Sequence, residues 1–162
     1  MKILGLALIS LLILVYATGF FLPSERSAQK TARIKAPPEK VFATITDLSR
    51  QGWRSQVDQV EVLDSTPGRE VWLERPKWGP PHKFRTRLKN PPHRFEIEMI
   101  DNPSFGGFWV GTLRATENGE TEIEFTEHVI VNGPFAKVMS RLFFDLESSI
   151  TTYIEDLKRA TE

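Results

Sequence analysis

The clearest pattern in the chain is an uncharged apolar stretch at residues 3–22. At about 1.5 Å per residue, a helix of this length would measure roughly 30 Å, the thickness of the hydrocarbon core of a bilayer. A cleaved signal peptide is the alternative, but its apolar region usually holds about 7–15 residues and ends in small residues. Here the stretch ends in the bulky sequence "TGFFLPSER". The pattern therefore predicts a retained single-pass membrane anchor over residues 1–24, with the lipid bilayer as a partner through residues 3–22.

The charges that flank this stretch leave the orientation of such an anchor open. The positive-inside rule alone would keep the carboxy-terminal side cytoplasmic, because Arg26, Lys30, Arg33 and Lys35 lie just beyond the stretch. A very short amino-terminal head with a lysine instead favours export of the downstream chain. We expect the domain to be extracytoplasmic.

After a polar linker at residues 25–30, residues 31–162 have the size of one domain. A strand is predicted at residues 31–36, and six later segments alternate between apolar and polar residues, each bounded by turn residues. Short turns between consecutive strands favour an antiparallel sheet with one apolar and one charged face. The apolar face is expected to carry Phe84, Leu88, Phe95, Ile97, Met99, Ile123, Phe125, Val129 and Val131.

Two segments have the apolar spacing of helices. A short helix is predicted after the first strand, with Pro37 and Pro38 at its start, where a missing N–H is tolerated. Residues 134–160 keep apolar residues at i, i+3, i+4 and i+7, including Met139 and Phe143. The pattern predicts an α+β fold in which a seven-stranded, curved antiparallel sheet wraps around a long carboxy-terminal helix.

Composition and motifs exclude several classes of function. The chain has 21 basic and 21 acidic residues, which argues against nucleic acid as a partner. It has no cysteine, and His82, His93 and His128 lack the spacing of metal ligands. No nucleophile motif or phosphate-binding loop is present, so we expect no metal, no cofactor and no motif-defined enzyme.

Three stretches resemble the SRPBCC superfamily, which includes START domains, polyketide cyclase/dehydrase-like proteins and relatives of the birch-pollen allergen. They are "IKAPPEKVFATITDLSRQGWRSQVDQVEVL", "GREVWLE" with "NPPHRFEIEM", and "TEIEFTEHVIVNGPFAKVMSRLFFDLESSITTYIEDLKR". The last of these is similar to membrane-anchored bacterial members, and the resemblance covers residues 29–157. It implies a helix-grip fold with two short helices after the first strand and a cavity between sheet and long helix. Trp53 would then lie at the mouth of the cavity or plug one end of the core.

This resemblance implies a membrane-tethered module that binds a small hydrophobic or lipid-like ligand in the cavity. The alternative is an enzyme similar to polyketide cyclases or dehydratases acting in the same cavity. A third possibility is a core filled by side chains, with the domain serving as a scaffold for partners. The residues expected to line the cavity are Trp53, Phe84, Phe95, Ile97, Phe125, Glu127, Met139 and Phe143.

Glu127 is the one candidate catalytic residue. Strict alternation places it on the same face as Phe125 and Val129. A carboxylate buried there would need a partner, water or a proton. A bulge between Thr126 and Val129, or a position at the end of the strand, would turn it towards solvent. Otherwise Glu127 would orient a ligand hydroxyl or act as a general acid or base.

Overall fold

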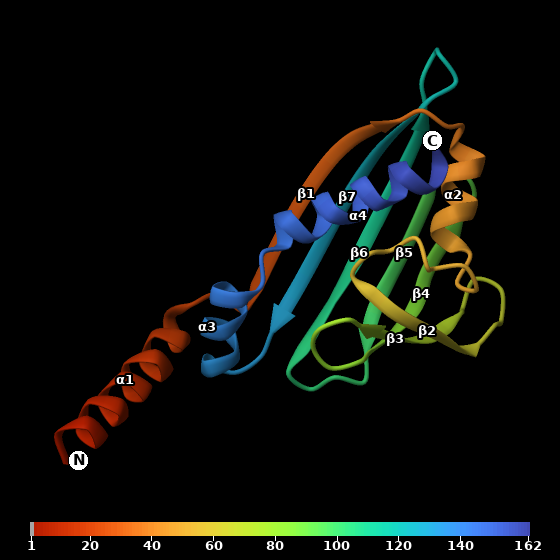
Figure 1. Ribbon diagram of the computed structural model, residues 1–162. Coiled ribbons are helices and arrows are strands. Elements are labelled where there is room, and N and C mark those ends of the chain that lie inside the picture. The colour runs from red at the N-terminus through yellow and green to blue at the C-terminus, as the bar shows by residue number, and fades with distance from the viewer. Residues whose placement is uncertain (1) are drawn as a thin grey trace.

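The computed structural model describes residues 2–162, without the side chains of residues 2–4 and 8. Figure 1 shows a curved sheet with helices along one face and at both of its ends. The elements are α1 (Lys2–Phe21), β1 (Glu25–Ile34), α2 (Pro38–Thr46), β2 (Val57–Asp64), β3 (Val71–Pro76), β4 (His82–Asn90), β5 (Arg94–Ile100), β6 (Phe105–Ala115), β7 (Thr121–Val131), α3 (Pro134–Phe143) and α4 (Leu146–Thr161).

Within the described residues, seven strands form one antiparallel sheet in the order β1-β7-β6-β5-β4-β3-β2. The predicted seven-stranded antiparallel sheet is therefore confirmed. The strand β1 begins earlier than the sequence predicted, because Glu25 already pairs with Ile130 of β7. Residues 25–30, which we expected to form a linker, belong to this strand.

The helices differ from the prediction at two places. Of the two short helices expected after β1, residues 38–46 form α2, whereas residues 47–56 form a series of turns. The predicted long carboxy-terminal helix is divided into α3 and α4 at Phe144 and Asp145. Asp145 caps α4, because its carboxylate accepts hydrogen bonds from the backbone N–H groups of Glu147 and Ser148. The apolar spacing continues across this break and therefore did not reveal it.

The predicted membrane anchor is wrong. Across the described part of the chain, no helix has both the length and the apolar character needed to cross a membrane. This finding overturns the predicted single-pass and extracytoplasmic location, and it leaves the lipid bilayer without support as a partner. The end of α1 instead packs on α3, where the carbonyl oxygen of Pro134 leaves no room for a Cβ atom at Gly19. Lys137 Nζ also donates to the carbonyl of Leu22 at 3.1 Å.

The core lies between the inner face of the sheet, α2 and α4, and Figure 1 shows α4 running along that face. One predicted core position is wrong. A register shift between Thr86 and Leu88 places Leu88 opposite Glu96, on the outer face, where it is 41% exposed. The buried apolar core consists of Ile34, Ala36, Val41, Phe42, Ile45, Trp72, Phe95, Leu113, Ile123, Phe125, Ile150, Ile154 and Leu157.

Candidate functional site

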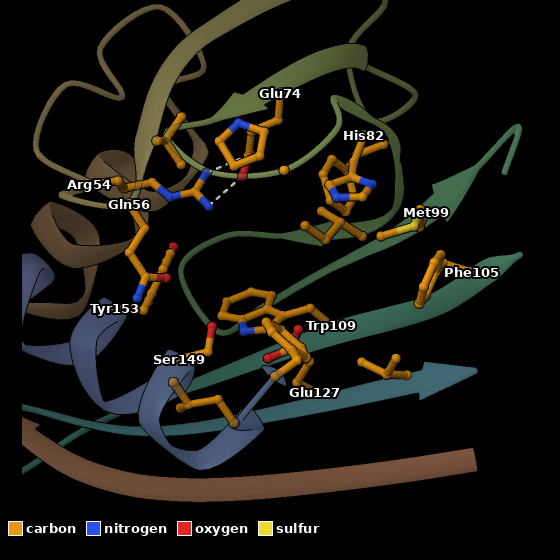
Figure 2. A pocket seen from close by; sticks show the side chains of 18 of the residues that line it. Arg54, Gln56, Glu74, His82, Met99, Phe105, Trp109, Glu127, Ser149 and Tyr153 are labelled. Carbon is orange, nitrogen blue, oxygen red and sulfur yellow. Dashed lines mark hydrogen bonds and ion pairs between the residues drawn. The ribbon is translucent and has the colours of Figure 1, made fainter. Parts of the chain in front are cut away.

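A cavity of about 640 Å³ lies between the inner face of the sheet, the turns after α2, and the helices α3 and α4. Its walls are mainly apolar and aromatic, and the side chains in Figure 2 converge on it from strands and helices. Side chains therefore do not fill all of the volume between the sheet and the helices. The third possibility raised by the sequence, a filled core, therefore does not describe this protein.

The structure brings most of the predicted cavity residues together. Trp53 and Phe125 are the exceptions. Phe125 is fully buried behind the wall, with its ring centroid 4.8 Å from that of Trp109. Trp53 packs against the core, with its ring centroid 5.2 Å from that of Tyr153. This position agrees with the second of the two expectations, in which Trp53 plugs one end of the core. The predicted residues that line the cavity are Phe84, Phe95, Ile97, Glu127, Met139 and Phe143.

Trp109 is a cavity residue that the sequence analysis missed. It stands on the inner face of β6, between Ile97 on β5 and Glu127 on β7. Gly111, two residues further along the same face, makes room for its indole ring, because a Cβ atom there would lie 2.5 Å from Cη2 of Trp109. Alternation in "GGFWVGT" places Trp109 on the same face as this glycine, a signal that could have identified it.

A buried ion pair joins the turns after α2 to β3. Arg54 Nη1 and Nη2 donate to Oε2 and Oε1 of Glu74, each at 2.7 Å, and Figure 2 shows this two-pronged contact. The guanidinium also lies 5.4 Å from the ring centre of Tyr153. Burial lowers the pKa of Arg54, but the Glu74 carboxylate, helped by Tyr153 and Asp156, leaves that pKa above its ordinary value. Arg54 is therefore a charged group whose charge Glu74 already balances.

Glu127 projects from β7 into the cavity. The pairing of β7 with both neighbours is continuous at this position, where Glu127 lies opposite Ala28 on β1 and Trp109 on β6. This stretch of β7 therefore has no bulge that would turn Glu127 outward, and Glu127 does not lie at the end of the strand. In the portion of the chain that the structure describes, the carboxyl group makes no hydrogen bond or ion pair.

Burial raises the pKa of Glu127 to about 7, although Arg54 acts in the opposite direction and Glu74 adds to the increase. Burial also lowers the pKa of His82, which lies opposite Glu74 on the neighbouring strand, and the Glu74 charge acts in the opposite direction. The pKa of Tyr153 is raised by burial, so its phenol keeps its proton. Among the described groups that line the cavity, Glu127 is therefore a carboxyl whose pKa is raised to about 7.

Residues 25–162 match the sequence profile of a family described as polyketide cyclase / dehydrase and lipid transport. The chain belongs to this family. Comparison with curated proteins gives no significant match.

Solved structures with the same fold include an aromatase/cyclase, Zhui from Streptomyces sp. R1128. It is 13% identical over 84% of this chain and 93% of that chain, with a TM-score of 0.67. Norcoclaurine synthase from Thalictrum flavum is 8% identical over 89% of this chain and 90% of that chain, also with a TM-score of 0.67. A protein from Thermus thermophilus is 16% identical, covering 83% and 95%, with a TM-score of 0.66. These likenesses show that the chain shares the fold of these proteins, a curved antiparallel sheet that wraps around a carboxy-terminal helix.

The arrangement offers two chemical capacities. Apolar and aromatic walls can take up an apolar molecule, and a carboxyl group with a pKa of about 7 can accept or donate a hydrogen bond and exchange a proton. Among the described residues there is no group of three or more His, Cys, Asp or Glu side chains placed to hold a metal ion.

Proposed function

We propose that this protein binds a small, mainly apolar molecule in the cavity, with Glu127 as its polar contact. The observation that carries the proposal is a cavity of about 640 Å³ whose apolar walls surround one carboxyl group without a protein partner among the described residues. Ligand sites of proteins have volumes of roughly 300–1,000 Å³ and combine apolar walls with a few polar groups. The family description, which includes lipid transport, supports the same class of function.

The rim of the cavity supports exchange of the ligand with its surroundings. Trp78, in the loop between β3 and β4, is 92% exposed, and Phe143, at the end of α3, is 81% exposed. Both residues also line the cavity, so the space opens to the outside between this loop and α3. An apolar ligand entering here would first contact aromatic rings and then reach Glu127 on the sheet.

Binding should change the tryptophan emission, with Trp109 as a stronger reporter than Trp53. Trp109 lines the cavity, whereas Trp53 lies in the core beside Tyr153. Titration with lipids, sterols and aromatic compounds is the measurement. Trp109→Phe should remove a larger part of the emission change than Trp53→Phe, which is the matched control. The proposal fails if none of these compounds changes the emission or the melting temperature of the parent protein.

A second candidate function is general acid–base catalysis on a polyketide-type substrate. The specific observation in its favour is the pKa of about 7 at Glu127, which allows the carboxyl to take and return a proton inside an apolar cavity. Membership of a family that includes cyclases and dehydrases supports this candidate.

The catalytic candidate predicts that the protein converts a poly-β-ketone into a cyclised product that has lost water. Mass spectrometry of the products is the measurement, and the rate should depend on the ionisation of Glu127 near pH 7. Glu127→Gln should lower kcat by about a hundredfold or more, because general acid–base catalysis contributes factors of roughly 10²–10⁴. If product forms at the same rate with Glu127→Gln, Glu127 is not the catalytic group.

A further inference from the structure

We infer that the cavity selects ligands that carry a protonated amine over ligands with the same apolar body that carry a carboxylate, and that Glu127 makes this selection. The inference rests on the proposed function, because it assigns a class of ligand to the same cavity. It derives from the charged groups that line the cavity and from the partners that each of them already has.

Among the residues that the structure describes, the charged side chains that line the cavity are those of Arg54, Glu74 and Glu127. Arg54 directs both terminal nitrogens at the two oxygens of Glu74, so its charge is balanced within the protein. His82 also lines the cavity, and burial lowers its pKa, which favours the uncharged imidazole. Within the described chain, the carboxyl group of Glu127 is the charge that remains. A ligand carboxylate would meet no free cation there, whereas a ligand amine would meet an unpaired anion.

The direct neighbours of Glu127 on the adjoining strands are uncharged. Ala28 on β1 and Trp109 on β6 are its direct neighbours, and Phe125 and Val129 flank it on the same face of β7. Figure 2 shows the Glu127 carboxyl beside Trp109 and on the other side of the cavity from the Arg54–Glu74 pair. The indole ring can also contribute, because cations bind favourably to the faces of aromatic rings.

On β1, Arg26 and Lys30 lie two residues before and after Ala28, on the same face of the strand. Both cations donate hydrogen bonds to groups other than Glu127. Arg26 donates to the backbone carbonyls of Ser140 and Phe144, at 2.9 and 3.2 Å. Lys30 Nζ donates to Thr151 Oγ1 at 2.5 Å. Neither Arg26 nor Lys30 lines the cavity. From α4, Ser149 and Tyr153 face the cavity, and both are uncharged.

The selection should strengthen as the pH rises. With a pKa of about 7, Glu127 is largely protonated near pH 6 and largely ionised near pH 8. An amine gains its counter-ion over this interval, so its affinity rises. A carboxylate ligand meets a second negative charge over the same interval, so its affinity falls. A neutral alcohol has no charge to pair and should change least.

The test uses three probes with one naphthalene body: 1-naphthylmethylamine, 1-naphthalenemethanol and 1-naphthoate. Calorimetric titration of the full chain at about pH 8 should give an amine Kd about tenfold or more below that of the carboxylate, since close charge pairs discriminate strongly. Glu127→Gln should bring the two Kd values to within about threefold of each other. Glu124→Gln is the matched control, because Glu124 lies on the opposite face of β7, across from Thr31 and Thr112, and should leave the selection unchanged.

The outcomes separate this inference from the proposed function. If no probe binds, the selection is overturned; the cavity function fails as well only if lipids, sterols and aromatic compounds also leave the tryptophan emission and the melting temperature unchanged. If all three bind but the amine and the carboxylate have equal Kd values in the parent protein, the cavity function stands and the selection is overturned. If the amine is preferred equally in Glu127→Gln, the assignment to Glu127 is overturned. Should that variant fold poorly, the affinity ratio of amine to carboxylate in the parent is measured at about pH 6 and pH 8, and a ratio that does not rise overturns the inference.

Discussion

Replacing Arg54 with Met should lower the free energy of unfolding by about 3–5 kcal/mol, because it leaves the carboxylate of Glu74 buried without its partner. The side chains of Arg54 and Glu74 are only 22% and 11% exposed, and they are joined by two hydrogen bonds of 2.7 Å each. Methionine keeps most of the length of the arginine side chain. The decrease in the free energy of unfolding therefore comes mainly from the lost charge and its hydrogen bonds, and less from lost packing. Urea unfolding of the full chain is the measurement.

Two further variants show whether burial is the cause. Arg75→Met removes a neighbouring arginine whose partner, Glu61, lies 3.8 Å away, with both side chains about half exposed. Exposed pairs of this kind contribute at most about 1 kcal/mol. Replacing Arg54 and Glu74 together by Met and Leu should recover most of the stability, since no unpaired charge remains. Equal losses for Arg54→Met and Arg75→Met would contradict the assignment of a buried pair.

The sheet could be predicted from the sequence because its strands and turns are determined by residues that are close together in the chain. Alternation fixes which side chains share a face, and the turn residues between segments fix antiparallel neighbours. Phe95 and Phe125 are buried on the inner face as this pattern predicted. The prediction failed at Leu88, because a bulge after Thr86 reverses the alternation without changing the composition of the strand. It also failed where Asp145 interrupts an apolar stripe that continues on both sides.

The candidate site was only partly predictable, because its polar groups meet through the fold. Glu127 was found because a carboxylate at an apolar position of a strand is locally anomalous. Arg54 and Glu74 are 20 residues apart and come from a turn and a strand, so their pairing required the three-dimensional arrangement. Alternation along "VWLERP" is compatible with Glu74 on the same face as Trp72, but it gives no sign of the partner of Glu74. Without that pair, the sequence could not show that Glu127 is the carboxyl group left free.

Glu127→Leu should raise the free energy of unfolding of the ligand-free protein by about 2–3 kcal/mol at about pH 8. The reason is the pKa of about 7 in the folded protein against an ordinary value of 4.5. A shift of about 2.5 pH units corresponds to roughly 3.5 kcal/mol at about 1.4 kcal/mol per unit, and we expect a smaller effect because the cavity is open to solvent. Leucine removes the charge and adds an apolar group to an apolar wall.

The stabilisation should depend on pH with a definite sign. Between pH 4.5 and about 7 the folded protein holds a proton on Glu127 that the unfolded chain has released. The folded state therefore binds more protons in this window, and the free energy of unfolding of the parent falls as the pH rises through it. Above about pH 7 the Glu127 contribution becomes constant, and below about pH 4 it vanishes. Denaturant unfolding of the parent, Glu127→Leu and the control Glu124→Gln at about pH 4, 6 and 8 measures this. A gain for Glu127→Leu that is equally large at about pH 4 and about pH 8 would mean that packing, and not the buried carboxylate, accounts for the difference in stability.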